Sequence, residues 1–155
     1  MTQKILIAYF TKVGASKEYA TIIADNLTSD GYLVDIYDLA HSQPDLAPYD
    51  IVILGTGVKI NRVYGKWKKI LKQPLINTKY LFLFLSSGMA EDEPEKAVGK
   101  YLQPIVKKYG LCPKSLISFP GKIPEKWAKY EEKKVTMNPD AARAWAQEII
   151  QIVQQ

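Results

Sequence analysis

Residues 4–17 read KILIAYFTKVGASK, and this stretch predicts a strand, a turn and the start of a helix. The apolar run 5–10 is short, β-branched and aromatic, which is typical of a strand buried on both faces. The turn at 11–16 contributes two hydroxyl groups and a glycine, and apolar residues then recur at helical spacing through Leu27. Because the free N–H groups and the dipole of a helix N-terminus attract negative charge, we expect this turn to bind a phosphate.

Further strands are predicted at 32–37, 51–54, 80–85 and 114–119. Helices are predicted from Val63 to just before Pro74, from Pro94 to Gly110, and from Asn138 onward. Segments 38–49 and 121–137 lack a period and are expected to be surface connections. Strands that alternate with helices predict an α/β fold, in which a five-stranded parallel sheet of order 2-1-3-4-5 lies between two helix layers. We expect residues 1–155 to form a single domain.

The composition excludes several classes of protein. With 47% hydrophobic and 24% charged residues the chain resembles an ordinary globular protein, and no stretch approaches the roughly 20 apolar residues of a membrane span. No leader pattern is present at the N-terminus. One cysteine, Cys112, and one histidine, His41, predict neither a disulfide, nor a metal site, nor a catalytic side chain. We therefore expect a cytoplasmic setting.

The net charge of +5 leaves two interpretations open. Lysines gather at 66–72 and at 122–134, where Trp127 and Tyr130 lie among them. They form either ordinary solvated faces or a surface that attracts an acidic protein or an anionic membrane. A nucleic acid is not expected as a partner, because no known nucleic-acid-binding motif is evident.

Three loops are expected to meet at the carboxyl ends of the first, third and fourth predicted strands. They are 11–16, 56–64 and 86–90, and each contains small or hydroxyl residues. In a doubly wound sheet the ligand binds at this edge, where the winding direction reverses. The loops are therefore either a ligand site or three ordinary turns.

The pattern T-x-x-G-x-S at 11–16 resembles the phosphate loop [ST]-x-T-G-x-[ST] of the flavodoxin family. Thr11, Gly14 and Ser16 match that loop, whereas Val13 stands where a threonine is usual and removes one hydroxyl donor. The resemblance implies that the loop binds the phosphate of FMN. The alternative is that Thr11 and Ser16 only cap the following helix.

The resemblance extends to the two other loops and implies the residues of the FMN site. Tyr64 or Trp67 would stack near the flavin ring, or else pack in the core, and Lys59 or Arg62 would favour the anionic reduced flavin. The expected cofactor-binding residues are Thr11, Lys12, Val13, Gly14, Ala15, Ser16, Thr56, Gly57, Val58, Lys59, Tyr64, Ser86, Ser87 and Gly88.

Within the family, the stretch 55–67 and the basic charge are most similar to the flavodoxin-like protoporphyrinogen oxidase branch. That likeness implies electron transfer to a redox partner protein or a quinone, at an anionic membrane surface. The short link after the fourth predicted strand departs from the branch. The sequence thus predicts an FMN-dependent electron carrier or oxidoreductase, with a flavin-free binding or regulatory module as the alternative.

Overall fold

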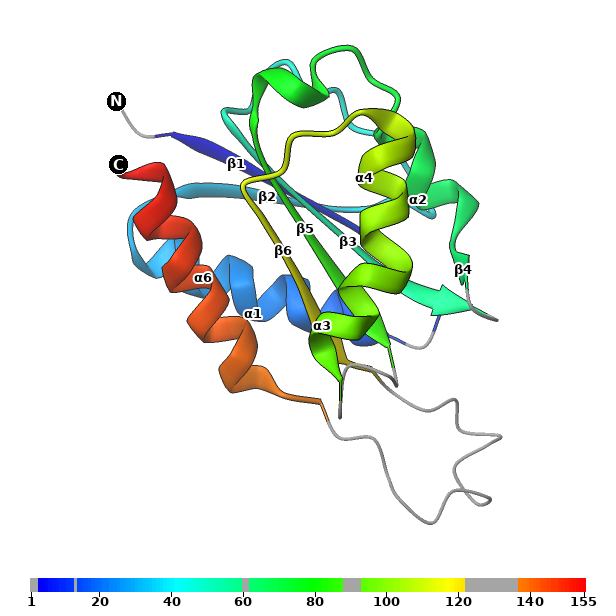
Figure 1. Cartoon of the computed structure of the whole chain (residues 1–155). Helices are drawn as coiled ribbons and strands as arrows, with labels where there is room; N and C mark the ends of the chain where they lie inside the picture. Colours follow the sequence, from blue (N-terminus) through cyan, green and yellow to red (C-terminus); the bar gives the residue numbers. More distant parts are fainter. Residues whose placement is uncertain (1–2, 13, 60–61, 88–92, 122–136) are drawn as a thin grey trace.

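The computed structural model describes residues 3–12, 14–59, 62–87, 93–121 and 137–155. A parallel sheet runs through the centre of the molecule, in the order β2-β1-β3-β5-β6 (Figure 1). A short strand, β4, pairs antiparallel with the end of β3. The order of the parallel strands confirms the predicted 2-1-3-4-5 topology. The strands are β1 (Lys4–Phe10), β2 (Leu33–Asp38), β3 (Ile51–Lys59), β4 (Arg62–Val63), β5 (Tyr80–Ser87) and β6 (Ser115–Pro120).

Helices cover both faces of the sheet (Figure 1). The long helices α1 (Ala15–Ser29) and α6 (Pro139–Val153) pack on one face. The other face carries shorter elements. These are α2 (Gly65–Ile70), the 3-10 turn η1 (Ile76–Thr78), α3 (Pro94–Ala97), the π-helical segment η3 (Val98–Leu102) and α4 (Gln103–Tyr109).

Strand burial follows position in the sheet. In β1 all residues from 5 to 10 are buried, as expected for a parallel strand with a neighbour on each side and helices on both faces. At the edge, β2 has two exposed apolar side chains, Leu33 and Ile36. This agrees with the predicted order 2-1-3-4-5, in which the second strand is an edge strand.

Three details of the predicted elements are wrong. Strand β3 does not end at Leu54 but continues to Lys59, because β4 pairs with its last residues. Val63 consequently belongs to β4 instead of the second helix, which begins at Gly65. The third helix is interrupted by η3, and Pro104 follows this segment without an N–H group for a normal helical hydrogen bond.

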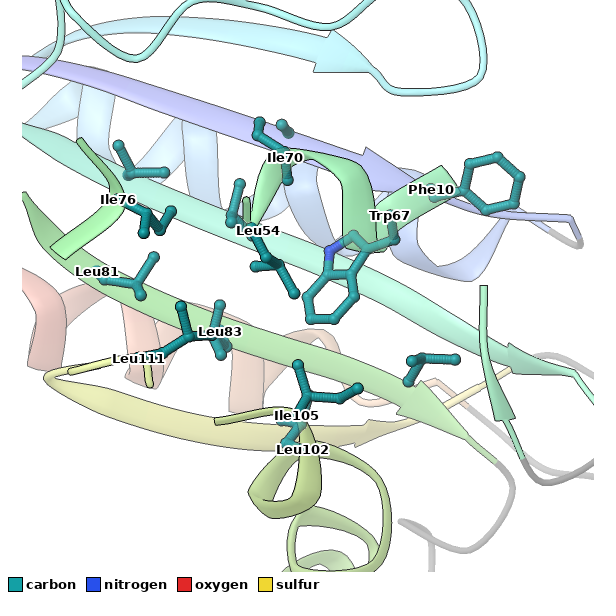
Figure 2. Packing of buried hydrophobic residues seen from close by; sticks show 14 of the residues in the cluster. Phe10, Leu54, Trp67, Ile70, Ile76, Leu81, Leu83, Leu102, Ile105 and Leu111 are labelled. Carbon is teal, nitrogen blue, oxygen red and sulfur yellow. The ribbon is translucent and has the colours of Figure 1, made fainter. Parts of the chain in front are cut away.

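Trp67 is a core residue. Its side chain has no exposed surface, and Figure 2 shows the indole between Leu54 and Phe10. This packing supports the core alternative for Trp67 and leaves Tyr64 as the aromatic side chain near the expected site. The indole nitrogen has no hydrogen-bond partner among the described residues.

A polar cluster joins β1 and β2 to the segment before β3. The Tyr49 hydroxyl donates to Asp35 Oδ2 at 2.7 Å, and Lys4 Nζ lies 3.4 Å from the same oxygen. The hydrogen bond from Tyr49, with a further contribution from Lys4, lowers the pKa of Asp35 from its usual value near 3.8. The charged form is therefore favoured in the folded protein.

We expect Asp35 to stabilise the fold above pH 4 and to lose that effect as the pH falls through its lowered folded-state pKa. The side chain is 43% exposed, so solvent screening keeps the contribution below about 1 kcal/mol. Urea unfolding of the Asp35→Asn variant at pH 7 and pH 3 measures this contribution to stability, and Tyr49→Phe is the matched variant. Asp35→Asn should be less stable than the parent chain at pH 7, and the difference should be smaller at pH 3. A constant difference at both pH values would contradict the assignment.

Candidate functional site

The strand register brings the three predicted loops to the same edge of the sheet. Phe10 lies beside Thr56, and Gly57 lies beside Ser86. The turn after β1, the end of β3 and the end of β5 are therefore neighbours. This arrangement is the one predicted for the carboxyl ends of the strands.

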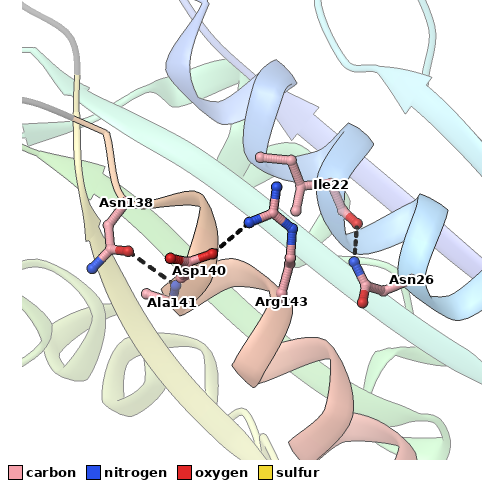
Figure 3. Close-up of polar contacts among 6 residues, drawn as sticks. All are labelled: Ile22, Asn26, Asn138, Asp140, Ala141 and Arg143. Atoms are coloured by element: carbon pink, nitrogen blue, oxygen red, sulfur yellow. Dashed lines mark hydrogen bonds and ion pairs between the residues drawn. The ribbon is translucent and has the colours of Figure 1, made fainter.

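The turn between β1 and α1 leaves the N-terminus of α1 open. Gly14, at φ 93°, is in the left-handed region, which favours glycine, and its N–H donates to Thr11 Oγ1 at 2.8 Å. In the described part of the chain no side-chain cap is present at the N-terminus of α1. At α6, by contrast, Asn138 Oδ1 accepts from Ala141 N at 3.1 Å (Figure 3). Thr11 therefore bonds the N–H of the N-cap residue itself and Gly14 supplies no cap, which speaks against the capping alternative and leaves first-turn N–H groups of α1 that can donate to an anion.

The Ser16 hydroxyl connects two of the loops. It is fully buried, and its oxygen lies 2.9 Å from Ser86 Oγ, which is also buried. A Cβ atom added to Gly57 would lie 3.7 Å from Ser86 Oγ and 4.0 Å from Ser16 Oγ. The two hydroxyls thus bond across the end of β3, and the first turn of α1 is attached to the end of β5.

Replacing one of these serines should leave the other hydroxyl buried without a partner. We expect Ser86→Ala to lower the free energy of unfolding by about 1–3 kcal/mol. The double variant Ser16→Ala/Ser86→Ala should cost less than the sum of the two single changes, because it removes both polar groups. Urea denaturation of the four proteins measures this coupling. Additive losses would show that the two hydroxyls do not stabilise one another.

Ser87 presents a polar group that the described residues do not satisfy. Its side chain is 8% exposed, and its hydroxyl oxygen is buried without a hydrogen-bond partner in the described part of the chain. Its carbonyl accepts from Gly121 N at 3.0 Å, and a Cβ atom on Gly121 would come within 3.3 Å of Ser87 N. A buried hydroxyl of this kind requires a partner, which a polar ligand can provide.

Tyr64 also lies beside Gly57. Its ring packs against Phe10 with the centroids 4.8 Å apart, and a Cβ atom on Gly57 would be 3.6 Å from the Tyr64 ring. Burial raises the pKa of Tyr64, so the phenol is neutral at physiological pH. The half-buried ring therefore provides an apolar wall beside the backbone of Gly57.

The remaining predicted site residues divide into three groups. Ala15 is buried at the start of α1, and Lys12 is exposed with Nζ 5.5 Å from the Phe10 ring centroid. Thr56 is fully buried and donates to the carbonyl of Gly57 at 3.0 Å, while Val58 is half-buried in β3. The side chain of Lys59 is not described, and Val13 and Gly88 lie outside the described residues.

One connecting residue was missed by the sequence interpretation, which treated Tyr19 only as an apolar position of the first helix. Its hydroxyl donates to the carbonyl of Pro120 and accepts from Asn138 N at 3.0 Å. Its ring stacks on Phe119 with centroids 4.6 Å apart. Tyr19 thereby attaches the end of β6 and the start of α6 to the helix that follows the anion turn. A fully buried tyrosine usually bonds through its hydroxyl, but the partner depends on the fold.

Solved structures with the same fold are flavodoxins or contain a domain of that shape. Oxidised flavodoxin 1 from Bacillus cereus superimposes with a TM-score of 0.67 at 16% identity, covering 96% of this chain and 97% of that one. A flavodoxin from Streptococcus pneumonia TIGR4 gives 0.65 at 18% identity, with coverage of 96% and 98%. The rubredoxin oxygen:oxidoreductase of Desulfovibrio gigas gives 0.66 at 16% identity, where 99% of this chain covers 36% of the larger protein.

No curated protein sequence matches the chain. The family model described as a flavodoxin domain, however, matches residues 6–137, which include the turn at 11–16, most of β1 and all the other strands of the sheet. The matched region is most of the 155 residues, and the observed strand order agrees with it. The chain therefore belongs to the flavodoxin domain family, whose cofactor is FMN.

Proposed function

We propose that this protein binds FMN at the carboxyl ends of β1, β3 and β5 and uses it for electron transfer or flavin-dependent oxidoreduction. The observation that carries the proposal is the open N-terminus of α1 behind the left-handed Gly14. A phosphate group there would accept from backbone N–H groups of the first turn, at the positive end of the helix dipole. The Thr11 hydroxyl, already bonded to Gly14 N, holds the turn in this conformation.

The other two loops fit a flat, partly polar ring. Gly57 has no side chain to cover its backbone, Tyr64 provides an apolar wall beside it, and Ser87 has a buried hydroxyl without a partner among the described residues. FMN supplies the redox chemistry when it is bound, so the protein needs to provide only binding, orientation and a suitable dielectric environment. A catalytic proton-transfer pair is not required for this role.

The spectrum of the purified protein tests the proposal. We expect a yellow protein with flavin absorption bands, and stoichiometric quenching of FMN fluorescence when FMN is added to protein stripped of cofactor. Riboflavin, which lacks the phosphate, should bind much more weakly, because it cannot use the N-terminus of α1. A colourless protein that does not quench FMN would favour the flavin-free binding module. Equal affinity for riboflavin would place the phosphate elsewhere.

We also propose, as the finer assignment, a protoporphyrinogen oxidase-like activity with a quinone acceptor. Its support is the sequence resemblance at 55–67 and the net charge of +5. Oxidation of protoporphyrinogen IX by the FMN-loaded protein with a soluble quinone measures it, and an absence of porphyrin fluorescence would leave the role of electron carrier. No helix among the described residues is long and apolar enough to cross a bilayer. A cytoplasmic location and membrane contact through 122–134, which lies outside the described residues, stay predictions.

A further inference from the structure

The two faces of the sheet carry opposite charge. Residues 63–87, which run from the end of β4 through α2 and η1 to the end of β5, contain five lysines and no carboxylate. Residues 96–113, from α3 to the segment after α4, contain four lysines and no carboxylate, and two exposed carboxylates, Glu93 and Glu95, precede them. Since α2 and α4 pack on the same face of the sheet, lysines about 35–40 positions apart in sequence belong to one surface (Figure 1). We call it the basic face; its exposed lysines are Lys66, Lys69, Lys72, Lys96, Lys100, Lys107 and Lys108, of which Lys96 pairs with Glu93.

The opposite face is acidic. Helix α1 and the turn after it carry Glu18, Asp25 and Asp30 against one lysine, and α6 carries Asp140 and Glu148 against one arginine. That arginine, Arg143, already pairs with Asp140 (Figure 3). Among the described residues the positive charge is therefore not distributed evenly but is greater on the side of α2 and α4.

The stability of the individual helices does not explain all the lysines of the basic face. Lys69 and Lys107 lie in the last turns of their helices, where a positive charge is favourable. Lys66, however, lies in the first turn of α2, where the helix dipole disfavours it, and Lys72 follows the helix. In the described part of the chain no carboxylate pairs with Lys66, Lys69, Lys72 or Lys107. An uncompensated group of like charges costs stability, and an anionic partner can compensate it.

We propose that the basic face docks the acidic surface of a protein, and that this partner is the electron-transfer protein that exchanges electrons with the flavin site. The second half of the statement rests on the proposed function. The face begins at the site, since α2 starts at Gly65, immediately after Tyr64. A partner on α2 is thus close to the carboxyl edge of the sheet.

The exposed side chains favour a protein over a lipid surface. Among the described residues of this face, Leu75, at 39% exposure, is the one large hydrophobic side chain that is exposed. Peripheral membrane proteins usually combine basic charge with several apolar or aromatic anchors, which this face does not present in its described part. Weak electrostatic docking of two soluble proteins needs only complementary charge, which mainly raises the association rate.

The first experiment maps the surface without requiring a flavin. A plant-type ferredoxin, a small acidic electron carrier, is mixed with the protein, and a carbodiimide then joins lysines to carboxylates in contact. Peptide mass spectrometry should place the cross-links on Lys66, Lys69, Lys72 and Lys107, and about 0.5 M salt should suppress them. Cross-links spread equally over Lys17 and Lys114, or unchanged by salt, would overturn the docking surface.

A charge-matched pair of variants gives the quantitative test. Lys69→Gln/Lys107→Gln removes two charges from the basic face, and Lys17→Gln/Lys114→Gln removes two from elsewhere on the molecule. At low salt we expect the first variant to bind ferredoxin about 3–10-fold more weakly and the control to change less than about twofold. Equal losses in both variants would overturn the proposal, because net charge alone would then explain binding.

Vesicles distinguish the alternative partner. The proposal fails if vesicles of anionic lipid bind the parent protein but not the basic-face variant, while ferredoxin binds both proteins equally. The surface would then be a membrane contact. If ferredoxin cross-links to the basic face but the protein binds no FMN, the docking surface stands and the proposed function fails. Stopped-flow reduction of bound FMN by reduced ferredoxin then tests the redox role. It should slow by the same factor as binding in the basic-face variant.

Discussion

Gly14→Asp should abolish FMN binding while the fold persists. An aspartate at this position would itself cap α1, and its carboxylate would occupy the N–H groups that a phosphate dianion requires. The carboxylate and the phosphate are both negative and would repel each other at close range. We expect FMN affinity to fall by at least about 100-fold, equivalent to about 2.7 kcal/mol. Fluorescence titration with FMN measures the loss, and circular dichroism verifies the fold.

Gly14→Asn is the matched control, because asparagine has nearly the same shape and also tolerates the left-handed conformation at φ 93°. It should keep considerably more affinity than the aspartate variant, since it adds no charge. Equal losses in the two variants would show that the backbone conformation, and not the electrostatics of the turn, controls binding. Retention of stoichiometric FMN by Gly14→Asp would place the phosphate elsewhere.

Gly55→Ala should destabilise the fold more than any surface change. Gly55 lies opposite Phe84 in the sheet, and a Cβ atom on it would be only 1.9 Å from Phe84 Cζ. The Phe84 ring is fully buried, with Phe119 and Trp145 each at a centroid distance of 6.0 Å, so it has little room to move. We expect a loss of about 1–3 kcal/mol in the free energy of unfolding, as for other overpacked cores.

Gly65→Ala is the control for this prediction. A Cβ atom there meets nothing within 4 Å, and alanine is favoured over glycine in a helix, so stability should stay constant or rise slightly. Phe84→Leu in the Gly55→Ala background should restore part of the loss, because leucine frees the space of the ring. Urea denaturation of the four proteins decides the question. A Gly55→Ala variant as stable as the parent chain would mean that Phe84 readily changes its position.

Local sequence patterns were sufficient for most of the fold. The strands are short apolar runs and the long helices α1 and α6 are amphipathic, so their spacing identifies them without knowledge of their neighbours. The alternation of strands and helices then permits few topologies, and the observed order is the expected one. The turn from strand to helix at 11–16 was also recognisable, because Gly14 and the start of α1 are consecutive in the chain.

Contacts between distant segments were decided only by the tertiary structure. The end of β3 was misjudged because β4 pairs with it, and such pairing leaves little trace in so short a strand. Ser16 was expected to face a ligand, yet its hydroxyl bonds Ser86, a residue 70 positions later. The basic face likewise exists because α2 and α4 share one side of the sheet. Local periodicity depends only on residues that are close in sequence, whereas these contacts depend on the topology that brings remote side chains together.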